Sequence, residues 1–427
     1  MELRTKYPPS GGWHRALAAA CVATDSVARG VGGERAADAV AGVVYGAAAV
    51  VAGSAIVDVP GVDAVFARGS LMRGAPLLGS SDIDLVIGLR DGLARSAEGA
   101  AVHETVKRLA RLRRVVPALD GNGVFLTRAE LSAGTAPLPL PPVLTPLAGR
   151  MELPRRERHT SAYWLVGLKA WWIPGLMRAG KTRMMARTLA SIERCAARLD
   201  SAPAGRPPDR PERPGDTQAL YARCLDLSER AYDLGPERLE GRIPPGRYRC
   251  RNIDDDGPRA YLVVESTRPE RLAPALSALR REEGVEVVTE KSLKFMLLSV
   301  RTPEAEVLRI ANPSLELARP SKAAMVRYWR WRSQPCFFRA PFKFSPDGPS
   351  ICRSAARARL YLEHGVSMDR AEDIRRAYKR AYGAWPFEEI NDARAFYVRE
   401  YPRLWDVADR VLEALARNPL GRLEDYV

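Results

Sequence analysis

The N-terminal part of the chain carries alternating patterns of helix and short strand. Small apolar residues over 16–53 predict an Ala-rich helix, and the apolar run at 62–67 predicts a buried strand that leads into a Gly-Ser turn. Residues 83–89 begin with alternating acidic and apolar positions, which predicts a strand with one functional face. A helical pattern over 93–114 and apolar strand material at 124–127 follow. This order predicts a sheet with flanking helices.

Pro-rich segments separate this part from the rest of the chain. Residues 136–154 and 201–217 are too rich in Pro for a regular helix or a central strand, so we expect linkers there. Between them, 159–199 has an apolar face at helical spacing.

Two further modules are predicted beyond the second linker. Residues 351–420 predict three or four amphipathic helices, broken at Gly365, Pro386 and Pro402. A small α/β module is expected before them, in the order strand, helix, strand and strand, at 260–266, 269–283, 285–289 and 295–300.

One uncharged stretch nearly reaches the length of a membrane span. Residues 39–57 hold no charge over nineteen positions, but they lack Leu and consist mainly of small residues, which contribute little to insertion. Asp38 and Asp58 border the stretch without basic anchors. We therefore expect a buried helix and no membrane span.

The composition bounds the class of protein. With 427 residues, 46% of them hydrophobic and 27% charged, the chain is long enough for several domains and is not disordered, collagen-like or a many-span membrane protein. The net charge of +15 permits binding to a polyanion, but the basic residues are spread along the chain. Six Cys without a CxxC pair, four His and no secretory signal at the start predict a reducing, cytoplasmic location without a zinc cage or disulfides.

The densest chemical signal lies between the first two predicted strands. Gly69 and Ser70, followed by Gly74, form a turn after a strand, where backbone amides and a hydroxyl can face phosphate oxygens. Asp82 and Asp84 are two positions apart on a strand, so both carboxylates project from one face and can share hard cations. A phosphate cradle followed by metal-binding carboxylates suits transfer of a nucleotidyl group, in which metal ions lower the charge on the α-phosphate.

This passage resembles the DNA polymerase β-like nucleotidyltransferase superfamily, whose hallmark is G-S followed by D-x-D, with a third carboxylate on a later strand. The matching residues are Gly69, Ser70, Asp82 and Asp84. The resemblance implies an α+β fold with a nucleotidyltransferase-type mixed sheet and flanking helices, followed here by helical and small α/β modules. It also implies Mg²⁺ dependence and transfer of a nucleoside monophosphate from an NTP, for which we predict ATP, to a hydroxyl of a small molecule, a protein or RNA.

The Pro-rich linkers, the element patterns and the resemblance together divide the chain into five expected parts. These are an N-terminal helical segment at 1–60, a nucleotidyltransferase core at 61–135, a helical module at 155–235, a small α/β module at 236–320 and a C-terminal helical module at 321–427.

The expected site combines nucleotide-binding and metal-binding residues. Asp120 follows the apolar run at 115–119 and is the candidate third carboxylate, although the Gly-Asn-Gly after it is equally typical of a turn. Glu104 and Glu130 are other carboxylates for that role, and Arg68 or Arg73 can add positive charge against the leaving group. The catalytic and metal-binding set is Asp82, Asp84 and Asp120, and the nucleotide-binding set is Gly69, Ser70, Arg73, Gly74 and Ser81.

Two other functions stay open. Without a third carboxylate, the protein would be a degenerate module that senses nucleotides or binds a partner. Residues Gly175 to Thr182 satisfy G-x-x-x-x-G-K-[ST], the pattern of an NTPase phosphate-binding loop with Lys181. The aromatic residues and Pro174 before this segment favour a helix, a turn and a helix instead.

Two more patterns have both a structural and a functional interpretation. Arg359 and His364 match the R-x4-H pattern of small helical RNases, although a solvated helix end explains them better. Tyr328, Trp329 and Trp331 stand among Arg residues and can either stack on bases or form aromatic core.

Overall fold

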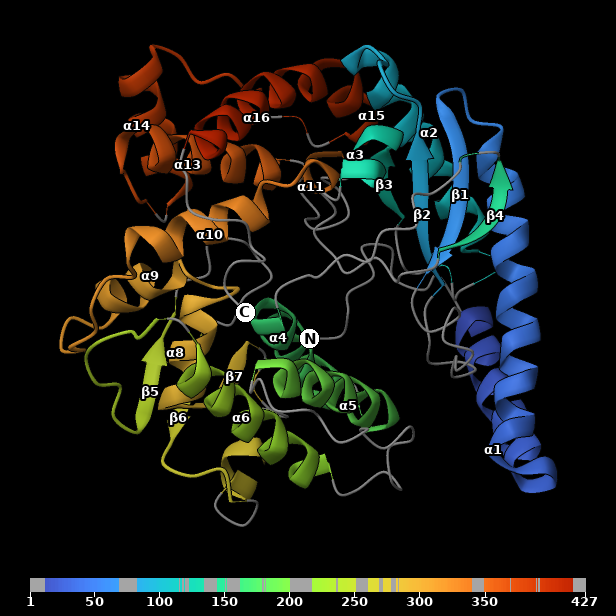
Figure 1. Ribbon diagram of the computed structural model, residues 1–427, viewed down its shortest axis with the longest axis horizontal. Helices are drawn as coiled ribbons and strands as arrows, with labels where there is room; N and C mark the ends of the chain where they lie inside the picture. The colour runs from blue at the N-terminus through green and yellow to red at the C-terminus, as the bar shows by residue number, and fades with distance from the viewer. Residues whose placement is uncertain are drawn as a thin grey trace.

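Two small sheets organise the chain, and helices surround each of them (Figure 1). The protein therefore has a mixed α+β fold, as predicted. The computed structural model describes residues 12–68, 83–114, 116, 119, 123–133, 144–149, 151, 162–178, 180, 182–199, 217–235, 237–250, 260–268, 272–277, 282, 284–339, 349–368, 370–388, 390 and 392–417.

The first sheet consists of four strands, β1 (Val62–Arg68), β2 (Asp84–Leu89), β3 (Val124–Thr127) and β4 (Thr145–Gly149), in the order β3-β2-β1-β4. Strand β1 pairs antiparallel with β2 on one side and with β4 on the other, whereas β2 and β3 are parallel. A parallel pair needs a crossover connection, and helix α2 (Arg95–Leu112) provides it. The predictions of the first two strands, the helix after them and the strand at 124–127 are confirmed.

Strand β4 corrects the prediction of a linker over 136–154. Residues 145–149 join the first sheet at its edge, where Thr145 pairs with Ala67. Pro146 is tolerated in this strand because the outer side of an edge strand has no ladder of hydrogen bonds to complete. The Pro content excludes a central strand but does not exclude an edge strand.

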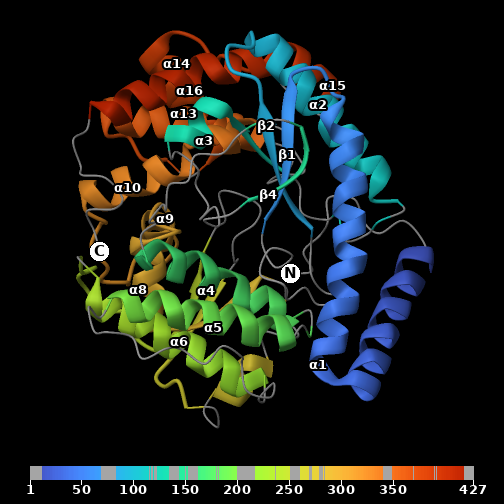
Figure 2. The ribbon, with the colours of Figure 1, turned by 45° about the vertical axis from the view of Figure 1, so that its right-hand side comes forward.

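Helix α1 (Gly12–Val57) lies along the first sheet (Figure 2). A kink at Gly33, whose φ of 69° falls in the left-handed region, divides α1 into two halves. The second half approaches β4 closely, because a Cβ on Gly53 would lie only 2.8 Å from the Cβ of Leu147. Arg108 of α2 also donates an Nη1 hydrogen bond of 2.8 Å to the carbonyl of Ala55. The helix predicted at 16–53 is confirmed.

The uncharged stretch 39–57 is buried on one face of α1 only. The opposite face is exposed, so the prediction of a buried helix is right for the side that meets the sheet. Among the described residues, Arg35–Val57 is the segment long and apolar enough to cross a membrane, with 33% of its most apolar window buried. The expected absence of a membrane span stays a prediction. The buried face consists of Ala41, Tyr45, Ala49, Ala52 and Ile56.

The second sheet carries the order β5-β6-β7 and packs beside three helices (Figure 1). Its first pair is antiparallel and its second pair is parallel. The helical region expected at 159–199 is confirmed as two helices with a turn between them. The strands are β5 (Gly246–Arg249), β6 (Ala260–Val264) and β7 (Val285–Thr289), and the helices are α4 (Ala162–Arg178), α5 (Thr182–Leu199) and α6 (Thr217–Leu234).

The strand predicted at 295–300 is wrong, because most of this segment belongs to helix α8 (Glu290–Leu298). Thr289 caps the helix: its hydroxyl accepts from the backbone N–H of Ser292 at 3.2 Å, and the Ser292 hydroxyl accepts from the N–H of Thr289 at 2.8 Å. The helix is buried all round from Ser292 onward, so the apolar periodicity that would reveal it is lost.

The C-terminal part is a layer of helices beside the first sheet (Figure 1). Gly365 has a φ of 67° directly after α13, and Pro402 lies in the first turn of α16, so the predicted breaks are helix ends. Further helices are α3 (Arg128–Ala133), α9 (Glu304–Ala311), α10 (Lys322–Arg332), α11 (Pro335–Arg339), α13 (Pro349–His364), α14 (Ala371–Tyr382), α15 (Ala393–Ala395), the π-helical turn η2 (Phe396–Glu400) and α16 (Tyr401–Ala416).

A buried arginine joins these helices to the first sheet. Arg339, with 1% of its side chain exposed, donates Nε to Glu98 at 3.0 Å and Nη2 to Glu130 at 2.7 Å. The hydroxyl of Tyr401 donates to the same Glu98 carboxylate at 2.6 Å. Burial alone would lower the pKa of the Arg339 guanidinium, but Glu130 and Glu98 raise it above its ordinary value. The cation therefore stays charged and links α11 and α16 to α2 and α3.

Replacing Arg339 by Met (Arg339→Met) should destabilise the protein by about 3 kcal/mol or more, because Glu98 and Glu130 lose the buried cation that they share and Glu98 is left with a pair of 3.4 Å to the partly exposed Arg95. Unfolding by urea, followed by circular dichroism, measures this loss. Arg410→Met is the matched control, since the Arg410 side chain is 58% exposed and its pair with Glu413 should contribute less than about 1 kcal/mol. Equal unfolding free energies for the two variants would show that Arg339 does not hold the layers together.

Candidate functional site

The end of β1 and the start of β2 bring a cation and a carboxylate together at one edge of the first sheet. This edge is formed by the ends of strands, and it is not the side formed by the outermost strand β4. Arg68 and Asp84 are direct partners in the antiparallel pair, so their side chains project from the same face. Nη2 of Arg68 lies 3.6 Å from Oδ1 of Asp84. The two groups form an ion pair, but this distance is too long for a hydrogen bond.

This pair is only partly satisfied by the protein. The Arg68 side chain is 12% exposed, and its Nε atom is buried without a hydrogen-bond partner. The Asp84 side chain is 36% exposed, whereas the rest of β2 is buried. Leaving a buried donor unpaired costs free energy, so this arrangement is not the one that stability alone would select. A guanidinium with an unpaired donor beside a partly exposed carboxylate suits a ligand that carries both an anion and a cation. The guanidinium would bind the anion, and the carboxylate would bind the cation.

Of the predicted catalytic and nucleotide-binding residues, Asp84 is the one that the structure describes. Two predicted metal ligands, Asp82 and Asp120, lie outside the described residues. The same holds for the nucleotide-binding set of Gly69, Ser70, Arg73, Gly74 and Ser81.

The two other carboxylates considered for the third position are engaged elsewhere. Glu130 accepts a hydrogen bond of 2.9 Å from the backbone N–H of Thr127, at the end of β3, and also pairs with Arg339. Because β2 and β3 are parallel and Asp84 begins β2, Glu130 lies at the opposite edge of the sheet. Glu104 accepts from Nε of Arg108 at 3.2 Å, and this hydrogen bond lowers the Glu104 pKa.

The segment with the pattern of a phosphate-binding loop has a different geometry. Gly175 lies inside α4, Gly180 forms a turn with a φ of 65°, and α5 begins at Thr182. The hydroxyl of Thr182 lies 3.3 Å from that of Thr217. A phosphate-binding loop follows a strand, whereas this turn joins two helices, so the helix, turn and helix prediction is confirmed. Lys181 lies outside the described residues.

The aromatic residues near Arg330 form core and do not offer a surface for bases. The exposed fractions of Tyr328, Trp329 and Trp331 are 6%, 1% and 6%. Stacking of nucleic-acid bases needs exposed rings, so the core interpretation is confirmed.

The R-x4-H pattern falls at the end of α13. Arg359 is not solvated, because it donates Nη1 to the Tyr378 hydroxyl at 2.9 Å and lies 3.9 Å from the centre of the Tyr382 ring. Its Nε also donates to Glu363 at 3.2 Å. His364 is exposed at the helix end. The prediction of a solvated helix end is therefore wrong for Arg359 and right for His364.

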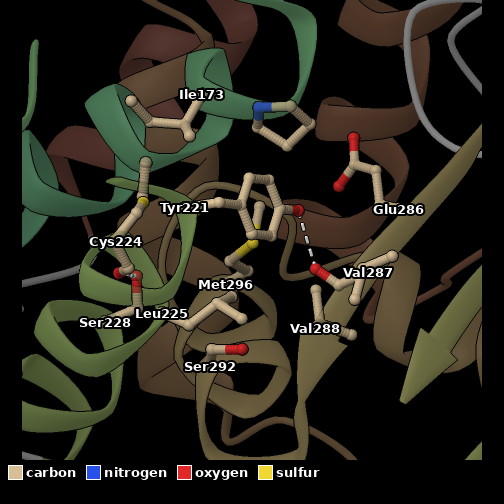
Figure 3. A pocket seen from close by; sticks show the side chains of 12 residues that line it. Ile173, Tyr221, Cys224, Leu225, Ser228, Glu286, Val287, Val288, Ser292 and Met296 are labelled. Carbon is tan, nitrogen blue, oxygen red and sulfur yellow. Dashed lines mark hydrogen bonds between the residues drawn. The ribbon is translucent and has the colours of Figure 1, made fainter. Parts of the chain in front are cut away.

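A cavity between α4, α6, β7 and α8 has a volume of about 20 Å³ (Figure 3). Tyr221 lines the cavity, and its hydroxyl donates to the carbonyl of Val287 at 2.8 Å. This volume holds about one water molecule, so the cavity is far too small for a nucleotide.

A buried charge network that the sequence analysis did not single out borders this cavity. Glu286 lines it and accepts from Nη2 of Arg301 at 2.9 Å. Arg301 also donates to the Tyr261 hydroxyl at 2.7 Å, and that hydroxyl donates to Glu304 at 2.5 Å. The available signal was Glu286 itself, a carboxylate in the otherwise apolar strand β7. The network ties α9 to the second sheet.

The metal-binding capacity of the described residues is limited. Within these residues, no group of three or more His, Cys, Asp or Glu side chains gathers closely enough to hold a metal ion. Asp84 contributes one carboxylate, and any fuller metal site depends on residues outside this set.

Comparisons with protein-family models, with curated proteins and with solved structures find no match to this chain.

Replacing Arg68 by Met should change the free energy of unfolding by about 1 kcal/mol or less, because its ion pair is long and Nε is unpaired. Urea unfolding beside Arg339→Met gives the comparison. A loss as large as that of Arg339→Met would mean that Arg68 is kept for stability and not for a ligand.

Proposed function

We propose that the protein is a Mg²⁺-dependent nucleotidyltransferase, which transfers a nucleoside monophosphate from an NTP, with ATP as the expected donor, to a hydroxyl of an acceptor. The position of Asp84 is the observation that carries this proposal. It is the first residue of an interior strand whose other five residues are buried, and its carboxylate is partly exposed beside Arg68. An acidic group at the end of a buried strand is costly unless a cation meets it.

The order of the elements supports the proposal. A helix, two antiparallel strands, a crossover helix and a third strand build a mixed sheet in which the acidic strand β2 is interior. This is the arrangement that the resemblance to nucleotidyltransferases implies for the core. The helices on both sides of the sheet agree with the flanking helices that it implies.

The connection between β1 and β2 is the second support. Arg68 and Asp84 are paired, so the chain leaves β1 and enters β2 at the same edge of the sheet. Gly69 is covalently joined to Arg68, and Asp82 stands two residues before Asp84. The antiparallel pairing brings Arg68, which precedes the G-S turn in the sequence, next to Asp84, which ends the D-x-D pattern, and this supports a shared site for phosphates and metal.

The chemistry of the pair fits Mg²⁺ and a triphosphate. Carboxylate oxygens are ligands that Mg²⁺ prefers, so Asp84, with Asp82 and Asp120 as the further proposed ligands, would hold the ion. When bound, Mg²⁺ would supply charge neutralisation at the α-phosphate. Arg68 carries a guanidinium beside Asp84 whose Nη groups can donate to a phosphate oxygen, and it would orient the triphosphate from the neighbouring strand.

Asp120 is the proposed third carboxylate. It precedes β3 by four residues in the sequence, and the parallel pairing makes β2 and β3 begin at the same edge of the sheet. Its proposed role is to complete the metal site and accept the proton of the acceptor hydroxyl.

The purified protein, incubated with Mg²⁺, ATP and cell extract, should transfer label from α-labelled ATP but not from γ-labelled ATP. Asp84→Asn should lower the rate by about 100-fold or more, because a metal ligand is lost. Lys181→Ala is the matched control, because it changes the other sequence pattern that is typical of phosphate binding. This variant should retain the transfer rate of the unmodified protein.

An unchanged rate in Asp84→Asn together with a lost rate in Lys181→Ala would replace the proposal by a phosphate-binding-loop NTPase. Tight, Mg²⁺-dependent ATP binding without transfer to any component of the extract would instead favour a nucleotide sensor.

Asp120→Asn should separate binding from transfer. Asp84 and Asp82 would still hold the metal that accompanies the nucleotide, so ATP affinity should change little, while transfer should fall by roughly 100-fold or more. Calorimetry measures the affinity, and the label-transfer assay measures the rate. Transfer at an unchanged rate would assign the third carboxylate to another residue.

A further inference from the structure

Gly123 stands where β3 begins, directly against the neighbouring strand β2. It precedes Val124, the first residue of β3, and it is buried. A Cβ on Gly123 would lie 2.1 Å from Cδ1 and 3.1 Å from Cγ1 of Ile87. Carbon atoms in good contact are about 3.5–4.0 Å apart, so the Ile87 side chain occupies the space that a side chain at position 123 would need.

The backbone conformation does not by itself require glycine at position 123. The pattern Asp-Gly-Asn-Gly over 120–123 is typical of a turn, in which glycine is used for its left-handed conformation. Gly61 and Gly92 have such conformations, with φ values of 93° and 72°, whereas Gly123 does not have a positive φ. The close approach of Ile87 is therefore the constraint that a larger residue would violate.

Ile87 has little freedom to make room for a side chain. It lies in the interior strand β2 and is fully buried. Its direct partner in β3 is Phe125, which is also fully buried and projects from the same face of the sheet as position 123. Because the core around Ile87 is closely packed, a methyl group at position 123 would have to separate the start of β3 from β2 by about 1 Å.

Strand β3 should move in response, and β2 should stay in place. Strand β3 is the outermost strand on its side of the first sheet, whereas β2 is hydrogen-bonded to β1 as well, where Arg68 faces Asp84. The Cβ at position 123 would also lie 3.8 Å from the carbonyl oxygen of Leu85, which is an ordinary contact distance. Asp84 should therefore keep its position.

The chain is also anchored just before Asp120. Leu119 is 1% exposed and belongs to the same core cluster as Ile87, and its backbone N–H donates to the carbonyl of Val116 at 3.1 Å. Gly123 follows Asp120 by three residues. A displacement at Gly123 would therefore be transmitted over a short segment to the proposed third carboxylate.

We infer that Gly123 is a positioning residue for nucleotidyl transfer. By having no side chain, it lets β3 begin in contact with Ile87, and it thereby sets the position of Asp120 relative to Asp84. The inference rests on the proposed function, in which Asp120 completes the metal site and accepts the proton of the acceptor hydroxyl.

Gly123→Ala should lower the kcat of label transfer by about 10-fold or more, because a misplacement of about 1 Å can cost up to about 100-fold. ATP affinity in the presence of Mg²⁺ should change less than about twofold, since Asp84 keeps its position. The transfer assay at saturating ATP measures kcat, and calorimetry measures the affinity. Gly42→Ala is the matched control, because a Cβ on Gly42 of α1 would meet no atom within 4 Å, and it should retain the transfer rate.

Ile87→Val tests whether the contact itself is the cause, because it removes Cδ1 and leaves Cγ1. Gly123→Ala combined with Ile87→Val should transfer within about threefold of the rate of Ile87→Val alone. Circular dichroism establishes that each variant is folded. If Gly123→Ala alone does not fold, the folded double variant is the test, and a loss of its transfer would contradict the inference.

Two results would overturn the inference and leave the proposed function intact. One is unchanged transfer in Gly123→Ala while Asp120→Asn loses it. The other is an equal loss of ATP affinity and of transfer in Gly123→Ala, which would show that the substitution disturbs Asp84. Absence of transfer by the unmodified protein would reject the proposed function, and the inference with it.

Discussion

Strand β2 is hydrogen-bonded on both sides and buried from Leu85 to Leu89, and this burial decides where charge can lie on the first sheet. A carboxylate inside such a strand would lose its hydration, so Asp84 stands at the first position, where its side chain stays partly exposed. The antiparallel neighbour β1 places Arg68 opposite, at 3.6 Å. The pair balances charge without satisfying every donor, which leaves this edge of the sheet suited to a ligand.

The sheet is held on both sides by interactions distant from that edge. Helix α1 packs against β1 and β4, and Arg108 fixes it to α2 through the carbonyl of Ala55. The C-terminal helices attach through Arg339, which binds Glu98 and Glu130. Because Glu130 follows β3 and Asp84 begins β2, the buried charge cluster around Arg339 and the candidate site lie at opposite ends of the strands of one sheet. A sheet that is anchored to helix α1 and to the C-terminal helices can hold a site in fixed geometry.

Local patterns predicted the strands and helices of the core, because each has its own periodicity or turn. They failed where burial removed the pattern, as in α8, whose residues from Ser292 to Leu298 are all buried. The edge strand that contains Pro146 was missed, because composition does not indicate whether one or both sides of a strand are paired. The position of Asp84 at the start of a buried strand was predictable, because acidic residues stand beside an apolar run in the sequence. The link from Arg339 to Glu98 was not, because 241 residues separate the partners and neither belongs to a motif.

The proposed nucleotidyl transfer depends most on Asp84 as a metal ligand next to bound nucleotide. A crystal of the protein with Mn²⁺ and a non-hydrolysable ATP analogue tests this directly, because manganese is located by its anomalous scattering. We predict a manganese peak at about 2.1 Å from a carboxylate oxygen of Asp84, the coordination distance of the Mg²⁺ that it replaces, with the phosphates towards Arg68. A nucleotide bound elsewhere, with no manganese at Asp84, would contradict it.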